Sequence, residues 1–175
     1  MDVIILNGTG SSGKTSIAKQ LQEKLSNQYL NFSIDSVLYA LPPSDLQKMM
    51  QGLPIKRDGY DYAQLTQGYH NSIKGLLKAG CRLIIDSAWI DKQEIDNLNK
   101  VLEPFSVLRV GVKCRLSVCE EREKNRGDRA IGLAKSEFPV VHQYMNYDLI
   151  VDTTENSPNR AAKEVINYLN KMSEA

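Results

Sequence analysis

The 175-residue chain has few cysteines, no long apolar run and almost no net charge. Its three cysteines, Cys81, Cys114 and Cys119, form no CxxC pair and no His/Cys metal spacing, which excludes a secreted disulfide framework and favours reduced thiols in a cytoplasmic protein. The longest apolar run near the start covers residues 3–6, too short for a membrane span or a signal-peptide core. Twenty-two basic against 21 acidic residues give a net charge of +1, which removes the bulk electrostatic argument for a nucleic-acid partner.

What remains is the composition of a soluble globular protein. The chain is 42% hydrophobic and 25% charged, and its length suits one domain over residues 1–175. We therefore expect neither nucleic acid nor membrane as a partner. The sequence leaves the oligomeric state open.

Short β-branched runs alternate with helical patterns along the chain. The runs cover residues 3–6, 31–34, 83–85, 107–112 and 149–151, and their continuous apolar character is typical of strands buried on both faces. Helical patterns cover residues 15–25, 62–78, 95–102 and 116–124, and a last helix begins at Ser157 and Pro158. This alternation predicts an α/β fold, a three-layer α/β/α sandwich around a parallel sheet.

A glycine-rich loop follows the first predicted strand and fits the phosphate-loop (Walker A) pattern GxxxxGK[ST] at every fixed position. The loop reads Gly8-Thr9-Gly10-Ser11-Ser12-Gly13-Lys14-Thr15. Its glycines allow close approach of the backbone to phosphate, and its N–H groups face the anion together with the positive end of the next helix. Lys14 supplies a charge to the β- and γ-phosphates, and the Thr15 hydroxyl can bind Mg²⁺.

Two aspartates end predicted strands, Asp35 the second and Asp86 the third. Ligands of open parallel sheets bind beyond the carboxyl ends of the strands, so both carboxylates are expected to face the nucleotide. Asp86 is suited to the metal or its water shell, and Asp35 to accepting the proton of a substrate hydroxyl. The alternative for each is a helix N-cap, a position that Asp also favours.

A charged segment over residues 122–135 follows the fourth predicted strand. Arg122, Arg126 and Arg129 recur at helical spacing and could form a lid that closes over the transferring phosphate. The alternative is a solvated face on which these arginines pair with Glu121 and Glu123.

In these motifs the chain resembles the chloramphenicol phosphotransferase-like family of P-loop kinases, relatives of shikimate and adenylylsulfate kinases. The resemblance runs from the phosphate loop through Ile34-Asp35-Ser36, Ile84-Ile85-Asp86, Arg126-Gly127-Asp128-Arg129, Val141-His142 and Tyr147-Asp148 to Val151-Asp152-Thr153-Thr154. It implies a five-stranded parallel sheet in the order 2-3-1-4-5. It also implies ATP and Mg²⁺ as cosubstrate and cofactor, and phosphoryl transfer to the alcohol hydroxyl of a small molecule, as in chloramphenicol-type antibiotic resistance.

The same resemblance assigns roles to individual residues. It implies Asp35 as general base, Lys14 with Thr15 at phosphate and metal, Arg126 and Arg129 on the lid, Arg122 at the nucleotide, and Asp152 with Thr153 beside the adenine. Two positions depart from the family pattern: Ser87 replaces an acidic residue, and Glu137 stands where Gln is frequent. The acceptor-side segment, about residues 36–70, aligns poorly. A kinase of another acceptor (a nucleotide, a sugar acid or a protein) and an ATP-binding module without transfer therefore remain as alternatives.

Overall fold

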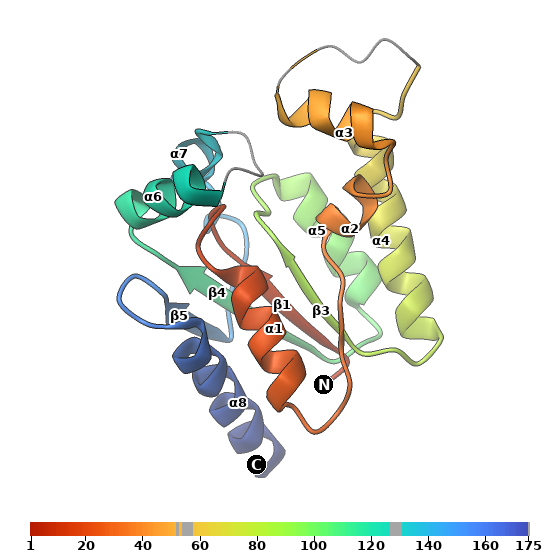
Figure 1. Ribbon diagram of the computed structural model, residues 1–175. Coiled ribbons are helices and arrows are strands. Elements are labelled where there is room, and N and C mark those ends of the chain that lie inside the picture. The colour runs from red at the N-terminus through yellow and green to blue at the C-terminus, as the bar shows by residue number, and fades with distance from the viewer. Residues whose placement is uncertain (52, 54–57, 127–130, 175) are drawn as a thin grey trace.

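The computed structural model of the chain is built on a five-stranded parallel sheet (Figure 1) and describes residues 1–51, 53, 58–126 and 131–174. The strands are β1 (Val3–Asn7), β2 (Leu30–Asn31), β3 (Leu83–Ser87), β4 (Val107–Lys113) and β5 (Leu149–Asp152). They lie in the order β2-β3-β1-β4-β5, and every neighbouring pair is parallel. The predicted fold class and strand order are confirmed.

Helices cover both faces of this sheet. On one face lie α1 (Lys14–Lys24) and α8 (Pro158–Glu174), and on the other lie α4 (Tyr62–Lys78) and α5 (Lys92–Leu102). Successive side chains of a strand point to opposite faces, so Ile4 of β1 packs in the α1/α8 core and Ile5 in the α4/α5 core. Within the described residues, no helix combines the length and the apolar character needed to span a membrane.

Four other helices of the described residues lie beyond the carboxyl ends of the strands. Figure 1 shows α2 (Ile34–Leu38) and α3 (Pro43–Met50) on the β3 side of the sheet, and α6 (Leu116–Arg126) and α7 (Leu133–Glu137) on the β4 side. The space between the two groups adjoins the phosphate loop, which connects β1 to α1. The fold therefore brings the acceptor-side and lid segments to opposite sides of one loop.

The predicted second strand over 31–34 is wrong in its bounds. Strand β2 ends at Asn31, and α2 begins at Ile34 because Ser33 and Ser36 form a reciprocal capping box. Asp35 therefore lies in the first turn of α2 and does not end a strand. It is not the N-cap either, since Ser33 occupies that position.

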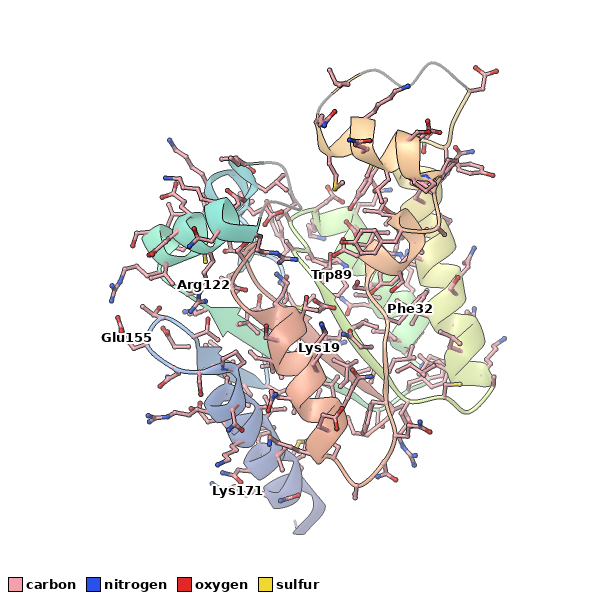
Figure 2. The ribbon with its side chains drawn as sticks, viewed as in Figure 1. Lys19, Phe32, Trp89, Arg122, Glu155 and Lys171 are labelled. Atoms are coloured by element: carbon pink, nitrogen blue, oxygen red, sulfur yellow. The ribbon has the colours of Figure 1, made fainter. Side chains whose placement is uncertain are left out.

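Trp89, which follows β3, belongs to the core. Its side chain is fully buried with residues of α4 and α5 (Figure 2). Its backbone N–H donates to Oδ1 of Asn7 at 3.0 Å, which ties the segment after β3 to the end of β1. Trp89 thus supports the carboxyl edge of the sheet from below the site.

Candidate active site

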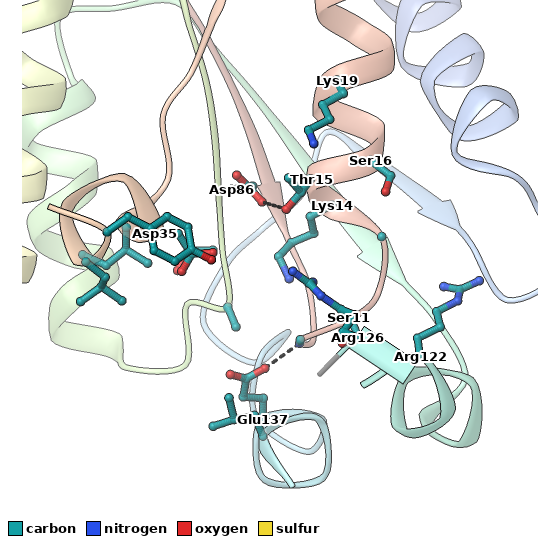
Figure 3. A pocket seen from close by; sticks show the side chains of 18 of the residues that line it. Ser11, Lys14, Thr15, Ser16, Lys19, Asp35, Asp86, Arg122, Arg126 and Glu137 are labelled. Atoms are coloured by element: carbon teal, nitrogen blue, oxygen red, sulfur yellow. Dashed lines mark hydrogen bonds between the residues drawn. The ribbon is translucent and has the colours of Figure 1, made fainter. Parts of the chain in front are cut away.

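A cavity of about 930 Å³ opens at the carboxyl edge of the sheet. The phosphate loop, α2, the end of β3 and helices α6 and α7 all contribute side chains to it (Figure 3). Lys14, Asp35, Asp86 and Arg126 line this one space. The structure therefore brings together residues that lie more than a hundred positions apart in the sequence.

At two glycines of the phosphate loop, any other residue would clash with a neighbour or strain the backbone. A side chain at Gly8 would place a Cβ 2.3 Å from the backbone oxygen of Val112 on β4. Gly13 adopts φ +94° as the N-cap of α1, a left-handed conformation that favours glycine. Thr153, the residue after β5, supports the loop, with its hydroxyl donating to the carbonyl of Ser12 at 2.7 Å.

Lys14 lies across the mouth of this loop. Its Nζ donates to the carbonyl oxygens of Gly8 and Thr9 at 2.7 and 2.9 Å, and the residue is only 7% exposed. These bonds hold a positive charge beside the loop N–H groups at the start of α1. The arrangement is suited to a polyphosphate, which helix N-termini and lysine attract together.

Thr15 and Asp86 place two side-chain oxygens in the same cavity as the lysine. The Thr15 hydroxyl donates to Oδ2 of Asp86 at 2.8 Å, and Asp86 is 5% exposed at the end of β3 (Figure 3). Mg²⁺ prefers oxygen ligands and takes only one or two from the protein when phosphates supply the others. Among the described residues no cluster of three or more His, Cys, Asp and Glu side chains could hold a metal. The donor set therefore fits Mg²⁺ carried by a nucleotide and not a metal held by the protein alone.

Asp35 lines the cavity from α2, across from the phosphate loop (Figure 3). Around it are apolar and aromatic residues of the predicted acceptor-side segment: Ile34, Leu38, Tyr39, Leu46, Met49, Met50 and Tyr62. The apolar side chains that follow Asp35 in the chain go to two places: Leu38, Met49 and Met50 line the cavity, while Val37 packs in the α4/α5 core. A carboxylate in an otherwise apolar wall is the main polar feature of this side.

The arginines of the predicted lid behave differently from one another. Arg122 and Arg126 line the cavity, and Arg122 donates from Nη2 to the carbonyl of Thr153 at 2.9 Å. Arg129 lies outside the described residues. Glu123, an alternative partner for these arginines, is buried and accepts hydrogen bonds from the N–H groups of Gly132 and Ala134 at 2.8 and 2.9 Å. Its carboxylate therefore joins α6 to the start of α7.

Of the two residues predicted beside the adenine, only Thr153 lines this cavity. Asp152 lines a neighbouring cavity of about 700 Å³, where its Oδ1 accepts from the N–H of Thr154 at 2.7 Å. Asn156 lines both cavities and was missed by sequence reasoning. An Asn in a loop after the last strand has no local pattern that would have marked it.

A partly buried network of polar side chains joins the end of β1 to residues 141–147. Asn7 Nδ2 donates to the hydroxyl of Tyr147 at 2.8 Å, and Nδ1 of His142 lies 2.7 Å from the same hydroxyl. Burial lowers the pKa of His142, which is consistent with a neutral ring, and burial raises the pKa of Tyr147 to about 12. The Tyr147 ring packs on Gly111, where a Cβ would come within 2.9 Å of it. This network fixes the Val141-His142 and Tyr147-Asp148 motifs against β1 and β4.

Glu137 was noted only as a departure from a family pattern, yet it touches the phosphate loop. Its Oε2 accepts a hydrogen bond of 2.6 Å from the N–H of Gly10 (Figure 3). The two residues are 127 positions apart, so spacing in the sequence could not have found the contact.

Solved structures with this fold include several kinases. A sugar kinase from Janibacter sp. superposes with a TM-score of 0.74 at 17% identity, covering 97% of this chain and 95% of that one. The APS kinase of Mycobacterium tuberculosis, solved with AMPPNP and APS, gives 0.69 at 18% identity, with 97% of each chain covered. At these identities the likeness shows the fold, that of P-loop kinases.

Sequence comparisons identify the family of this chain. A protein of Mycobacterium tuberculosis named "Putative O-phosphotransferase" is 28% identical over 180 residues, which cover 93% of this chain and 80% of the relative. The family model described as chloramphenicol phosphotransferase-like protein matches residues 1–170. The match spans the phosphate loop, both cavity aspartates and helices α6 and α7, and the chain belongs to the chloramphenicol phosphotransferase-like family of P-loop phosphotransferases.

Proposed function

We propose that this protein transfers the γ-phosphate of ATP to the alcohol hydroxyl of a small molecule. The observation that carries the proposal is that Asp35 and the phosphate loop line the same cavity. Membership of a phosphotransferase family supports phosphoryl transfer. The name of the mycobacterial relative supports an oxygen acceptor.

On the nucleotide side, the loop N–H groups and Lys14 bind and orient the triphosphate. Thr15 and Asp86 are the residues that would hold Mg²⁺, which neutralises charge on the phosphate oxygens when bound. Arg126 stabilises the negative charge that spreads over the transferring group. Arg122, fixed on the carbonyl of Thr153, borders the part of the cavity that holds the nucleoside.

On the acceptor side, Asp35 takes the proton of the attacking hydroxyl. A bond forms between the acceptor oxygen and the γ-phosphorus, and the bond from that phosphorus to the β–γ bridging oxygen breaks, leaving ADP. The proton passes to the Asp35 carboxylate and then to solvent. General bases of this kind contribute about 10²–10⁴-fold to rate.

The wall around Asp35 favours an acceptor with a large apolar or aromatic body. Tyr39 and Tyr62 offer flat apolar surface, and Met49 and Met50 offer side chains that adapt their shape. Chloramphenicol, an aromatic alcohol, is such a compound and is the first acceptor to test. Sugar acids and nucleotides carry negative charge that this apolar wall does not match.

Product analysis by mass spectrometry tests the proposal. The protein with Mg²⁺ and ATP should convert at least one of a panel of aromatic alcohols, chloramphenicol included, into its phosphate ester. Lys14→Met should abolish conversion, whereas Lys24→Met, an exposed lysine at the other end of α1, should leave it unchanged. ATP binding without any ester across alcohols, sugar acids and nucleotides would instead support a nucleotide-binding module.

A further inference from the structure

Glu137 holds a position in the cavity that a phosphate oxygen would otherwise occupy. The Gly10 N–H belongs to the phosphate loop, and it donates to the Glu137 carboxylate at 2.6 Å. A bond this short is typical of a charged acceptor. A carboxylate oxygen and a phosphate oxygen make the same demand on a backbone N–H, so only one of them can use it at a time.

Glu137 reaches the loop because α7 is anchored at both ends. At its start, the buried carboxylate of Glu123 accepts from the N–H groups of Gly132 and Ala134. At its end, Glu137 is the last residue of the helix and extends into the cavity. The helix therefore presents the carboxylate to the loop from a fixed position, joined through Glu123 to α6.

Charge in the cavity explains why a carboxylate is stable there. Lys14, 7% exposed, and Arg126 line the same space as the loop N–H groups. Positive groups directed at one enclosed space favour an anion. Asp35 and Asp86 also line this cavity, and Glu137 is the carboxylate that bonds to the Gly10 N–H of the loop.

We propose that Glu137 is a tethered competitor for the phosphate site and that nucleotide binding displaces its carboxylate from the Gly10 N–H. The proposal rests on the proposed nucleotide site. It goes further because it couples the position of α7 to phosphate binding. While Glu137 accepts from the Gly10 N–H, its carboxylate takes the place of a phosphate oxygen; when the phosphates bind, the carboxylate and the end of α7 are released from the loop. Glu137 thereby sets the affinity for nucleotide, since the apparent dissociation constant is the intrinsic one divided by the binding-competent fraction.

Isothermal titration of the whole chain with three probes tests this. The probes are MgADP, tripolyphosphate and adenosine, applied to the wild type, to Glu137→Gln and to Glu121→Gln, an exposed α6 glutamate with the same change in charge. We expect Glu137→Gln to bind MgADP and tripolyphosphate about tenfold more tightly, equivalent to about 1.4 kcal/mol. Adenosine, which carries no phosphate, should bind equally to all three proteins, and Glu121→Gln should match the wild type.

The outcomes separate this inference from the proposed function. Equal or weaker polyphosphate binding by Glu137→Gln overturns the inference, and so does an equal gain for adenosine. If the wild type phosphorylates an alcohol and Glu137→Gln shows no gain, only the inference fails. If neither protein binds a polyphosphate, both fail. A Glu137→Ala variant, which removes the carboxylate altogether, should gain at least as much polyphosphate affinity, and its thermal unfolding without ligand reports whether it folds.

Discussion

Adding one methyl group at Gly8 should destabilise the fold far more than adding one at Gly10, although both glycines lie in the same loop. At Gly8 the new Cβ would lie 2.3 Å from the backbone oxygen of Val112 and 3.0 Å from Oγ of Ser12. Contact normally begins at roughly 3.5 Å, so the loop or β4 would have to move by roughly 1 Å. Overpacking of this kind costs about 1–3 kcal/mol, and the higher end applies because the obstacle is backbone.

At Gly10 the nearest atom to an added Cβ is Oε2 of Glu137 at 3.1 Å, the end of a flexible side chain. Gly10 is not one of the glycines with positive φ, so alanine adds no backbone strain there. Rotation of the glutamate removes the contact. We expect the free energy of unfolding to change by less than about 0.5 kcal/mol.

Urea denaturation of the two alanine variants measures this difference. A loss of about 3 kcal/mol for Gly8→Ala corresponds to a fall in Tm of about 6–12 °C for a chain of this size. Gly8→Ala should also weaken MgADP binding, since the loop N–H groups shift with the backbone. If Gly10→Ala loses as much stability as Gly8→Ala, the close approach of Gly8 to β4 is not what fixes the loop.

Three further predictions concern polar groups around the site. Tyr147→Phe removes the hydroxyl that accepts from Asn7, and should lower the free energy of unfolding by about 1 kcal/mol in urea titrations; no change would mean that water replaces the bond. A hydrogen bond from Cys119 lowers the pKa of Cys114, so the pH midpoint of its alkylation by iodoacetamide should lie lower in the folded chain than in the urea-unfolded chain, and equal midpoints would contradict this. Burial lowers the pKa of His142, so as the pH falls below about 6.5 the unfolded chain binds the proton before the folded chain does, and the free energy of unfolding decreases. His142→Gln should therefore flatten the fall in Tm between about pH 7 and pH 5. An unchanged slope of Tm against pH would refute this.

The phosphate loop and the parallel sheet could be predicted because their signals are local. Buried β-branched runs and the glycine-lysine pattern each fit within a few residues, and apart from the bounds of the second strand the structure has both where they were expected. The strand order came from the family resemblance, since no run of residues states which strands are neighbours.

Asp35 shows how a prediction about the site can hold when the element beneath it is wrong. The sequence 31–34 is apolar enough for a strand, but the capping box of Ser33 and Ser36 starts a helix there instead. Asp35 still faces the cavity, because the first turn of α2 lies at the same edge of the sheet as a strand end would. The Asp35 carboxylate reaches the cavity because its segment lies at the carboxyl edge of the sheet, whether that segment is a strand or a helix.

Contacts between distant residues were beyond the sequence. The bond from Gly10 to Glu137 and the bond from Thr153 to Ser12 join segments more than 120 positions apart. Each depends on how α7 or β5 packs, and no spacing rule covers such packing. The buried Glu123 illustrates the same limit: within a run of charges it suggests a solvated face, and only the fold reveals its backbone partners.

The central claim is that Asp35 and the phosphate loop serve one reaction. The most direct test compares Asp35→Asn with the wild type in two measurements on the same acceptor: the rate of phosphoryl transfer and the affinity for a non-hydrolysable ATP analogue. We expect the rate of phosphoryl transfer to fall at least about a hundredfold in Asp35→Asn, while the affinity for the ATP analogue stays within about twofold of the wild type. Transfer at an undiminished rate would contradict it.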